Sequence, residues 1–354
     1  MNTFRSDLRP LLFDGAPWYA SLKAGHADTF GLWRVTKSPE EAYWAHLLSL
    51  AASFAQRHGL LEPYRIRIAG IPLQALTHSS AQREHRASTD QLWDVTNELI
   101  VAAYLERLLG WTYLQHEPQG RASHRGEWEF RTPSGRVVFV EVKSLHESEE
   151  VPRGVYSRGV QRDRIHAVLK GAYQQLPNDD RATLVVLVGR GELPRISHGI
   201  LYGDIFQSLF GQMQVRFPVG VDVEEARVRV TPSFRDMFVQ RAKHRRLGVI
   251  AGLALGGLEL PLARFYAIHN PYAHENCRLP ASDFADIHQF VVDAAGAAAQ
   301  VNGLSLEDAW ARIDAWEAPA SATGTAVPNL VIGGPSQDVA DRIEDRSGPP
   351  PEGK

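Results

Sequence analysis

The chain has 354 residues and a formal net charge of −3, with 44% apolar and 22% charged residues. These proportions are those of ordinary globular proteins, and they exclude a fibrous or largely disordered chain. The small net charge excludes attraction of the whole molecule to nucleic acid or to an anionic membrane, so any polyanion must be bound by a local basic patch.

Cysteine content and hydropathy indicate the compartment in which the protein works. A single cysteine, Cys277, excludes a disulfide framework and any zinc site that needs several cysteines from one chain. The first residues lack the apolar segment of a secretory signal, and no apolar run reaches the roughly 20 residues needed to cross a bilayer. We therefore expect a cytoplasmic protein with no membrane partner.

Residues 1–88 predict a small module of helix and strand. Apolar residues recur at helical spacing over 39–58, which predicts a helix. The segment 64–71 contains the run Arg-Ile-Arg-Ile, whose alternation predicts a strand. The polar stretch 77–90 has no apolar period and predicts a loop, so we expect a domain boundary there.

Residues 89–317 predict an α/β domain, and the proline-rich residues 318–354 predict a disordered tail. In chain order, the expected elements are a helix over 90–109, strands over 127–131 and 136–143, a helix over 162–176, strands over 183–188 and 226–230, apolar segments over 247–258 and 264–268, and a helix over 282–299. A Thr-Pro-Ser-Gly turn joins the first two strands into a hairpin, and Gly110 suits the position just past the end of a helix.

The end of the second hairpin strand carries a carboxylate and an amine. Glu141 and Lys143 are two residues apart, so they project from the same face of a strand, whereas Val140 and Val142 point to the opposite face. A carboxylate can bind Mg²⁺, and an adjacent ammonium can orient a water that attacks a phosphodiester. Taken alone, the pair is more typical of an ordinary surface strand.

The first hairpin strand supplies further acids at Glu127 and Glu129, so two carboxylates can converge on one metal. The order of an acid, an aromatic residue, a short turn, an apolar strand and Glu-x-Lys resembles the signature of the PD-(D/E)XK, or restriction-endonuclease-like, nuclease superfamily. The residues that carry this resemblance are Gly126-Glu127-Trp128-Glu129-Phe130 and Glu141-Val142-Lys143.

The resemblance implies a mixed sheet flanked by helices, with a metal site where two central strands diverge. Glu127 and Glu141 would hold the metal, and Lys143 would position the nucleophile. We favour Glu127 because the order acid, aromatic, polar, apolar begins there, and Glu129 is the alternative ligand. The usual Pro-Asp pair of the family is replaced by Gly126-Glu127, and the longer side chain moves the carboxylate outward by about one bond, which can change the metal geometry.

The family also places a glutamate on the helix before the hairpin, and Glu98 is the matching position. On helical spacing Glu98 lies on one stripe with Ala102 and Leu105, so it borders an apolar face. The resemblance implies that Glu98 completes the metal shell, directly or through water. The alternative interpretation is a glutamate stabilised by the helix dipole.

Two basic segments are candidates for contact with phosphates. The candidate residues are Arg158, Arg162, Arg164, Arg241, Lys243, Arg245 and Arg246. A solvated helix face or a charged loop explains these charges equally well. In the family the helix after the Glu-x-Lys strand often faces the site, and residues 162–176 resemble that helix, but for Gln174 and Gln175 we favour a solvent-facing position. The sequence also brings His269, His274 and Cys277 close together, but a zinc site needs three or four ligands in fixed geometry, so we do not favour one here.

The leading hypothesis is a Mg²⁺-dependent phosphodiesterase, with Mn²⁺ as a substitute, that cleaves nucleic acid and favours DNA. Two close carboxylates disfavour each other's ionisation, so a divalent cation is expected to stabilise the folded protein. The alternative is a catalytically silent protein of the same fold that binds nucleic acid or a partner protein, with a homodimer left open.

Overall fold

The structure is a computed structural model that describes a little over half of the chain. The described residues are 8–16, 18–19, 39–71, 82–145, 158–190, 205–206, 208–210, 213–216, 229–232, 244–255, 265–292 and 298–301. The segment 318–354, for which the sequence predicts disorder, lies outside these residues. Within them, no helix is long and apolar enough to cross a bilayer.

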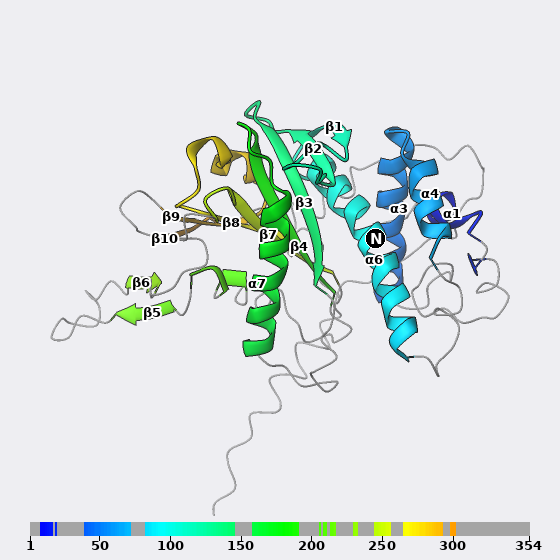
Figure 1. Cartoon of the computed structure of the whole chain (residues 1–354), viewed down its shortest axis with the longest axis horizontal. Helices are drawn as coiled ribbons and strands as arrows, with labels where there is room; N and C mark the ends of the chain where they lie inside the picture. The colour runs from blue at the N-terminus through cyan, green and yellow to red at the C-terminus, as the bar shows by residue number, and fades with distance from the viewer. Residues whose placement is uncertain are drawn as a thin grey trace, which may run out of the picture.

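A mixed sheet runs through the centre of the molecule (Figure 1). Over the described residues it has eight strands in the order β1-β2-β3-β4-β7-β8-β9-β10. Their bounds are β1 Thr112–His116, β2 Trp128–Arg131, β3 Val137–Leu145, β4 Ala182–Arg190, β7 Val249–Leu255, β8 Phe265–His269, β9 His288–Val292 and β10 Ala298–Val301. Strands β3, β4 and β7 run parallel to one another, and β2 pairs with β3 in the antiparallel sense. A separate antiparallel pair is formed by β5, Met213–Arg216, and β6, Arg229–Pro232.

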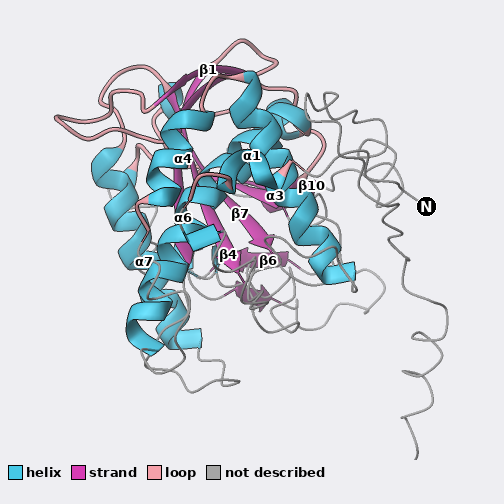
Figure 2. Ribbon diagram, turned by 90° about the vertical axis from the view of Figure 1, so that its right-hand side faces the viewer, coloured by secondary structure: helices cyan, strands magenta, loops and turns pink. Residues whose placement is uncertain are grey.

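Helices cover both faces of this sheet (Figures 1 and 2). One face is packed by α1 (Arg9–Phe13), α3 (Pro39–Arg57), α4 (Leu61–Ala69) and α6 (Gln82–Arg107), and the other by α7 (Arg158–Gln175). Alternation along β3 separates the two cores, because Val140 packs on the α6 side and Phe139 on the α7 side. The expected mixed α/β sheet with flanking helices is confirmed.

Most elements expected between residues 90 and 190 are confirmed, and α6 differs at its start. The helix expected from residue 90 begins at Gln82, so the loop expected over 77–90 is wrong from that residue onward. Residues 82–87 read Gln-Arg-Glu-His-Arg-Ala, and several of these types favour a helix without providing an apolar stripe. At the other end Gly110 has a φ of +65°, the left-handed conformation that glycine adopts after a helix.

The strand expected over 64–71 is wrong, because these residues belong mostly to helix α4. In a strand Ile66 and Ile68 would share a face, whereas here Ile68 is fully buried and Ile66 is 64% exposed. The buried pair is Tyr64 and Ile68, which are four residues apart and therefore adjacent on a helix. An alternation of four residues is too short to distinguish the period of a strand from the period of a helix.

The helix expected over 282–299 is also wrong. A short 3-10 helix, η4 (Ala281–Phe284), is followed by the paired strands β9 and β10. The amide of Gln289 donates to the carbonyls of Ala281 and Phe284, and this fixes the turn into β9. β-branched residues such as Val291 favour the extended form when a neighbouring strand is present.

The edge between β2 and β3 creates the feature that matters for function. Pairing begins at Arg131 with Val137 and stops at Trp128 with Val140, because β2 has four residues and β3 has nine. Beyond Val140, β3 continues to Leu145 beside β4 alone. The second half of β3 therefore has no β2 partner along this edge.

Candidate functional site

The open edge of β3 is covered by a side chain. Glu127 lies immediately before β2, and its Oε2 accepts a hydrogen bond of 2.9 Å from the backbone N–H of Val142. A carboxylate thus satisfies the backbone donor at a position where a strand carbonyl would otherwise bind. This contact brings Glu127 alongside the Glu-x-Lys segment of β3.

Three charged side chains meet at this point. The Nζ atom of Lys143 forms an ion pair with Glu141 and a second one with Oε1 of Glu127 at 3.6 Å. Its third contact is a hydrogen bond of 3.1 Å donated to Oε1 of Gln175, at the end of α7. Lys143 is therefore fixed between two carboxylates and an amide. The solvent-facing interpretation of Gln175 is wrong.

Burial shapes the electrostatics of this cluster. Burial and the nearby Glu127 carboxylate raise the pKa of Glu141 to about 9, and burial also raises the pKa of Glu127. Burial opposes the charge of Lys143, but the two carboxylates outweigh it and raise the pKa of Lys143. At neutral pH Glu141 is therefore largely neutral, and Lys143 faces a carboxyl pair that holds about one negative charge.

The cluster fits a divalent cation with oxygen ligands. Glu141 is fully buried, and its carboxyl group interacts with Lys143 and with the neighbouring Glu127 carboxyl. A cation between Glu127 and Glu141 would replace the proton that two close, buried carboxyl groups otherwise retain. The described residues hold no group of three or more His, Cys, Asp or Glu that could bind a metal. Mg²⁺ fits nonetheless, because one or two carboxylates, waters and substrate phosphates commonly complete its shell.

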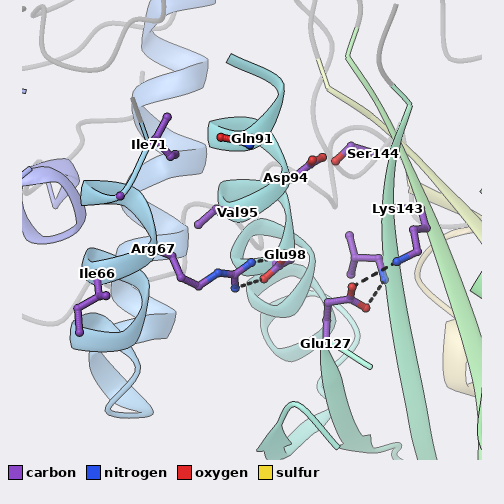
Figure 3. A pocket seen from close by; sticks show the side chains of 12 residues that line it. Ile66, Arg67, Ile71, Gln91, Asp94, Val95, Glu98, Glu127, Lys143 and Ser144 are labelled. Carbon is purple, nitrogen blue, oxygen red and sulfur yellow. Dashed lines mark hydrogen bonds and ion pairs between the residues drawn. The ribbon is translucent and has the colours of Figure 1, made fainter. Parts of the chain in front are cut away.

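A pocket of about 690 Å³ opens beside the cluster, between α4, α6 and β3 (Figure 3). Its lining residues are Ile66, Arg67, Gly70, Ile71, Gln91, Asp94, Val95, Glu98, Glu127, Val142, Lys143 and Ser144. Volumes of a few hundred Å³ are typical of sites for small ligands or for part of a larger one. Glu127 and Lys143 therefore face a space that a substrate group can enter.

Glu98 lines the same pocket but is held by other partners. Its two carboxylate oxygens accept hydrogen bonds of 2.6 and 2.7 Å from the guanidinium of Arg67, and Tyr64 donates its O–H to Oε2 at 2.9 Å. The indole N–H of Trp128 donates to the Glu98 carbonyl at 3.0 Å. Figure 3 shows Glu98 pointing to Arg67 rather than to Glu127. The structure thus brings Glu127, Glu141 and Lys143 together and places Glu98 across the pocket from them.

The alternative ligand Glu129 lies in a separate ion pair. Its Oε2 is 2.8 Å from Nη1 of Arg181, and its Oε1 accepts a hydrogen bond of 3.1 Å from Gln115. Glu129 is not among the residues that line the pocket. The geometry therefore places Glu127, and not Glu129, beside Lys143.

The basic candidates whose side chains are described lie outside the pocket lining. Of those with described side chains, Arg164 is half-buried on α7, Arg245 is exposed, and Arg246 donates to the Pro177 carbonyl at 3.1 Å. None of these three lines the pocket. Arg158 and Arg162 lie on α7, but their side chains are outside the described residues, as are Arg241 and Lys243 altogether.

Arg67 and Gln175 belong to the site but were not among the residues proposed from the sequence. Arg67 was assigned to a strand, and only a helix over 61–69 places it one turn from Tyr64 on the pocket side. The signal was present, because Leu61, Tyr64 and Ile68 are spaced as an apolar stripe. For Gln175 the signal is the resemblance of residues 162–176 to a helix that faces the site, and the packing of α7 on β3 makes its contact with Lys143.

Gly126, which precedes Glu127, is required by packing. A Cβ atom at this position would lie 2.3 Å from Cζ of Phe139, whose ring is fully buried. We expect Gly126→Ala to destabilise the protein by about 1–3 kcal/mol, because the ring has no room to move away. Urea denaturation measures this change.

Gly171→Ala is the matched control, because a Cβ at Gly171 on α7 would meet nothing within 4 Å. This variant should be neutral or stabilised by up to about 1 kcal/mol, since alanine favours a helix. Equal stabilities of the Gly126→Ala protein and the parent would contradict the packing argument.

No protein-family model, no curated protein and no solved structure matches this chain.

Proposed function

We propose that the protein is a Mg²⁺-dependent nuclease of the PD-(D/E)XK, restriction-endonuclease-like kind, and that DNA is its substrate. The observation that carries the proposal is the meeting of Glu127, Glu141 and Lys143 at the open edge of β3. Glu141 lies on β3, and Glu127 immediately precedes β2, whose pairing with β3 ends at Val140. Glu98 of helix α6 lines the same pocket.

Each residue of the cluster has a role in phosphodiester hydrolysis. Glu127 and Glu141 would hold Mg²⁺ or Mn²⁺, which when bound polarises a phosphoryl oxygen and lowers the pKa of a coordinated water. The Lys143 ammonium, fixed by Gln175, orients the attacking water and offsets the negative charge that develops on the phosphorus oxygens. Burial strengthens both effects, because water does not screen these charges.

The charge of the pocket supports a requirement for metal. Among its lining residues the acids Asp94, Glu98 and Glu127 outnumber the bases Arg67 and Lys143, and Glu141 lies directly behind them. A phosphate that enters without a cation would meet net negative charge. We therefore expect both cleavage and tight phosphate binding to depend on a divalent cation.

The test is cleavage of plasmid DNA in Mg²⁺ by the parent protein and by Lys143→Met. We expect the variant to cleave about 10²- to 10³-fold more slowly, the size of effect seen when one stabilising donor is removed from an active site. Lys170→Met is the control, because Lys170 is an exposed residue of α7; it should cleave at the parent rate. Equal rates for parent and Lys143→Met would overturn the proposal, as would a parent protein inactive on single- and double-stranded DNA and on RNA with Mg²⁺ and Mn²⁺.

A catalytically silent protein that binds nucleic acid or a partner protein is the second candidate. It is favoured by one observation: both carboxylate oxygens of Glu98 are occupied by Arg67, which leaves two acids at the cluster and not three. Fluorescence anisotropy with labelled DNA in Mg²⁺, run beside the cleavage assay, separates the candidates. Binding without cleavage by the parent protein supports the silent form.

A further inference from the structure

We propose that Arg67 of α4 binds a phosphate of the nucleic acid, on the wall of the pocket opposite Lys143. This inference rests on the proposed function, because it takes nucleic acid as the ligand. It adds a substrate contact outside the hairpin that carries the Glu-x-Lys segment. The contact would extend the binding surface from the reacting phosphate at β3 to a second phosphate of the same molecule.

Arg67 presents unused donors to the pocket. Its Nη1 and Nη2 atoms donate to the two oxygens of Glu98, and its Nη1 carries the shorter bond, of 2.6 Å. A guanidinium has five N–H donors, so the contacts with Glu98 and Tyr64 leave about two for another ligand. The side chain is 37% exposed, and Arg67 is among the residues that line the pocket.

The guanidinium is held in a fixed orientation. Glu98 forms a bidentate pair with the guanidinium, which fixes the plane of that group. The Arg67 Cζ atom also lies 5.0 Å from the centre of the Tyr64 ring. Glu98 is itself held by the Tyr64 hydroxyl. Because the Arg67 side chain is already ordered, little of its conformational entropy is lost when a ligand binds to it. Rigid, planar donors of this kind suit phosphate oxygens better than a flexible ammonium does.

The position of Arg67 suits the binding of a nucleic-acid backbone that crosses the pocket. Arg67 and Lys143 are the cationic side chains among the lining residues, and Figure 3 shows them on opposite walls, one on α4 and one on β3. Arg67 keeps donors beyond those bound to Glu98, whereas Lys143 would exchange one of its contacts with Glu127, Glu141 or Gln175 for a phosphate oxygen. A nucleic-acid backbone lying across the pocket can meet both.

The experiment measures the salt dependence of DNA binding in a Lys143→Met background. This variant is expected to cleave slowly, so the labelled DNA stays intact during the measurement. The test protein carries Arg67→Met and Glu98→Gln together, so one positive and one negative charge are removed and no carboxylate is left without its partner. Binding of a fluorescein-labelled DNA duplex is followed by anisotropy in Mg²⁺ over a series of salt concentrations. Loss of one phosphate contact should make the slope of log K against log salt shallower by about 0.9.

Arg65→Met in the same background is the matched control. Arg65 is on the same helix, but it donates to the Leu11 carbonyl at 2.6 Å and does not line the pocket. Its slope should equal that of the background protein. Circular dichroism melts confirm that each variant is folded at the assay temperature.

The outcomes separate this inference from the proposed nuclease activity. A slope that is unchanged in the Arg67→Met, Glu98→Gln protein overturns the Arg67 contact, even where the parent cleaves DNA. A shallower slope with a parent that never cleaves supports the contact and overturns hydrolysis. A background protein that binds neither duplex nor single-stranded DNA overturns the Arg67 contact, whereas cleavage by the parent decides the proposed hydrolysis.

Discussion

Glu141→Gln is expected to abolish metal-dependent cleavage and at the same time to stabilise the folded protein above neutral pH. The loss of activity follows because an amide is a poor replacement for a carboxylate ligand, and a metal contributes several kcal/mol to the stabilisation of charge in the transition state. We expect the rate to fall about 10²- to 10⁴-fold. The gain in stability follows from the burial of Glu141, which has no exposed surface.

The sign of the stability change is set by the pKa of Glu141, which is about 9 in the folded protein against an ordinary value of 4.5. Between these pH values the folded state keeps a proton that the unfolded state releases, so the free energy of unfolding falls as pH rises. Below pH 4.5 both states are protonated and this penalty is absent. Glutamine has no charge to bury, so the advantage of the variant should grow across this window and reach about 2 kcal/mol near pH 8.

Urea denaturation at pH 5 and pH 8, with cleavage assays on the same preparations, measures both changes. Glu117→Gln is the control, because Glu117 is 49% exposed and pairs with Arg125 outside the pocket. It should keep full activity, with no pH-dependent gain in stability. A Glu141→Gln protein that is less stable than the parent at pH 8 would show that the ionised Glu141–Lys143 pair stabilises the fold.

Mg²⁺ affinity is expected to rise about tenfold for each unit of pH between pH 6 and 8. With a pKa of about 9, Glu141 carries a proton over this whole range, and that proton must leave before the carboxylate can bind a cation. The fraction of protein ready to bind therefore increases with pH until the pKa is reached. An ordinary exposed carboxylate site would already be ionised and would show a flat profile.

Isothermal titration calorimetry with Mg²⁺ measures this linkage directly. Titrations in two buffers of different ionisation enthalpy should show about one proton released per ion bound at pH 7. The shift of the melting temperature with Mg²⁺ should increase over the same pH range, and both effects should disappear in Glu127→Gln. Binding that does not vary with pH, or that survives in Glu127→Gln, would place the cation elsewhere.

The hairpin and its charged residues could be predicted from the sequence because their signals are local. Strand alternation places Glu141 and Lys143 on one face, and the turn before β3 contains Gly135, which has a φ of +87°. The side-by-side position of Glu127 follows from the antiparallel register of the two strands. These features need only the residues of the hairpin itself.

The opposite wall of the pocket could not be predicted in the same way. Four alternating residues around Arg67 favour a strand locally, and only burial of Tyr64 and Ile68 against neighbouring helices makes the segment a helix. The pairing of Arg67 with Glu98 joins residues 31 positions apart on two helices. The sequence predicts a helix over β9 for a related reason, because its partners β8 and β10 decide its conformation.

The continuity of the core across residue 88 has a practical consequence for truncated forms of the protein. Leu48 and Phe54 of α3 share one apolar core with Leu99 of α6 and with β3. A fragment that starts at residue 89 would begin inside α6, lose the wall that carries Arg67, and expose the buried face of that helix to water. Such a fragment is a candidate for aggregation rather than a minimal catalytic unit.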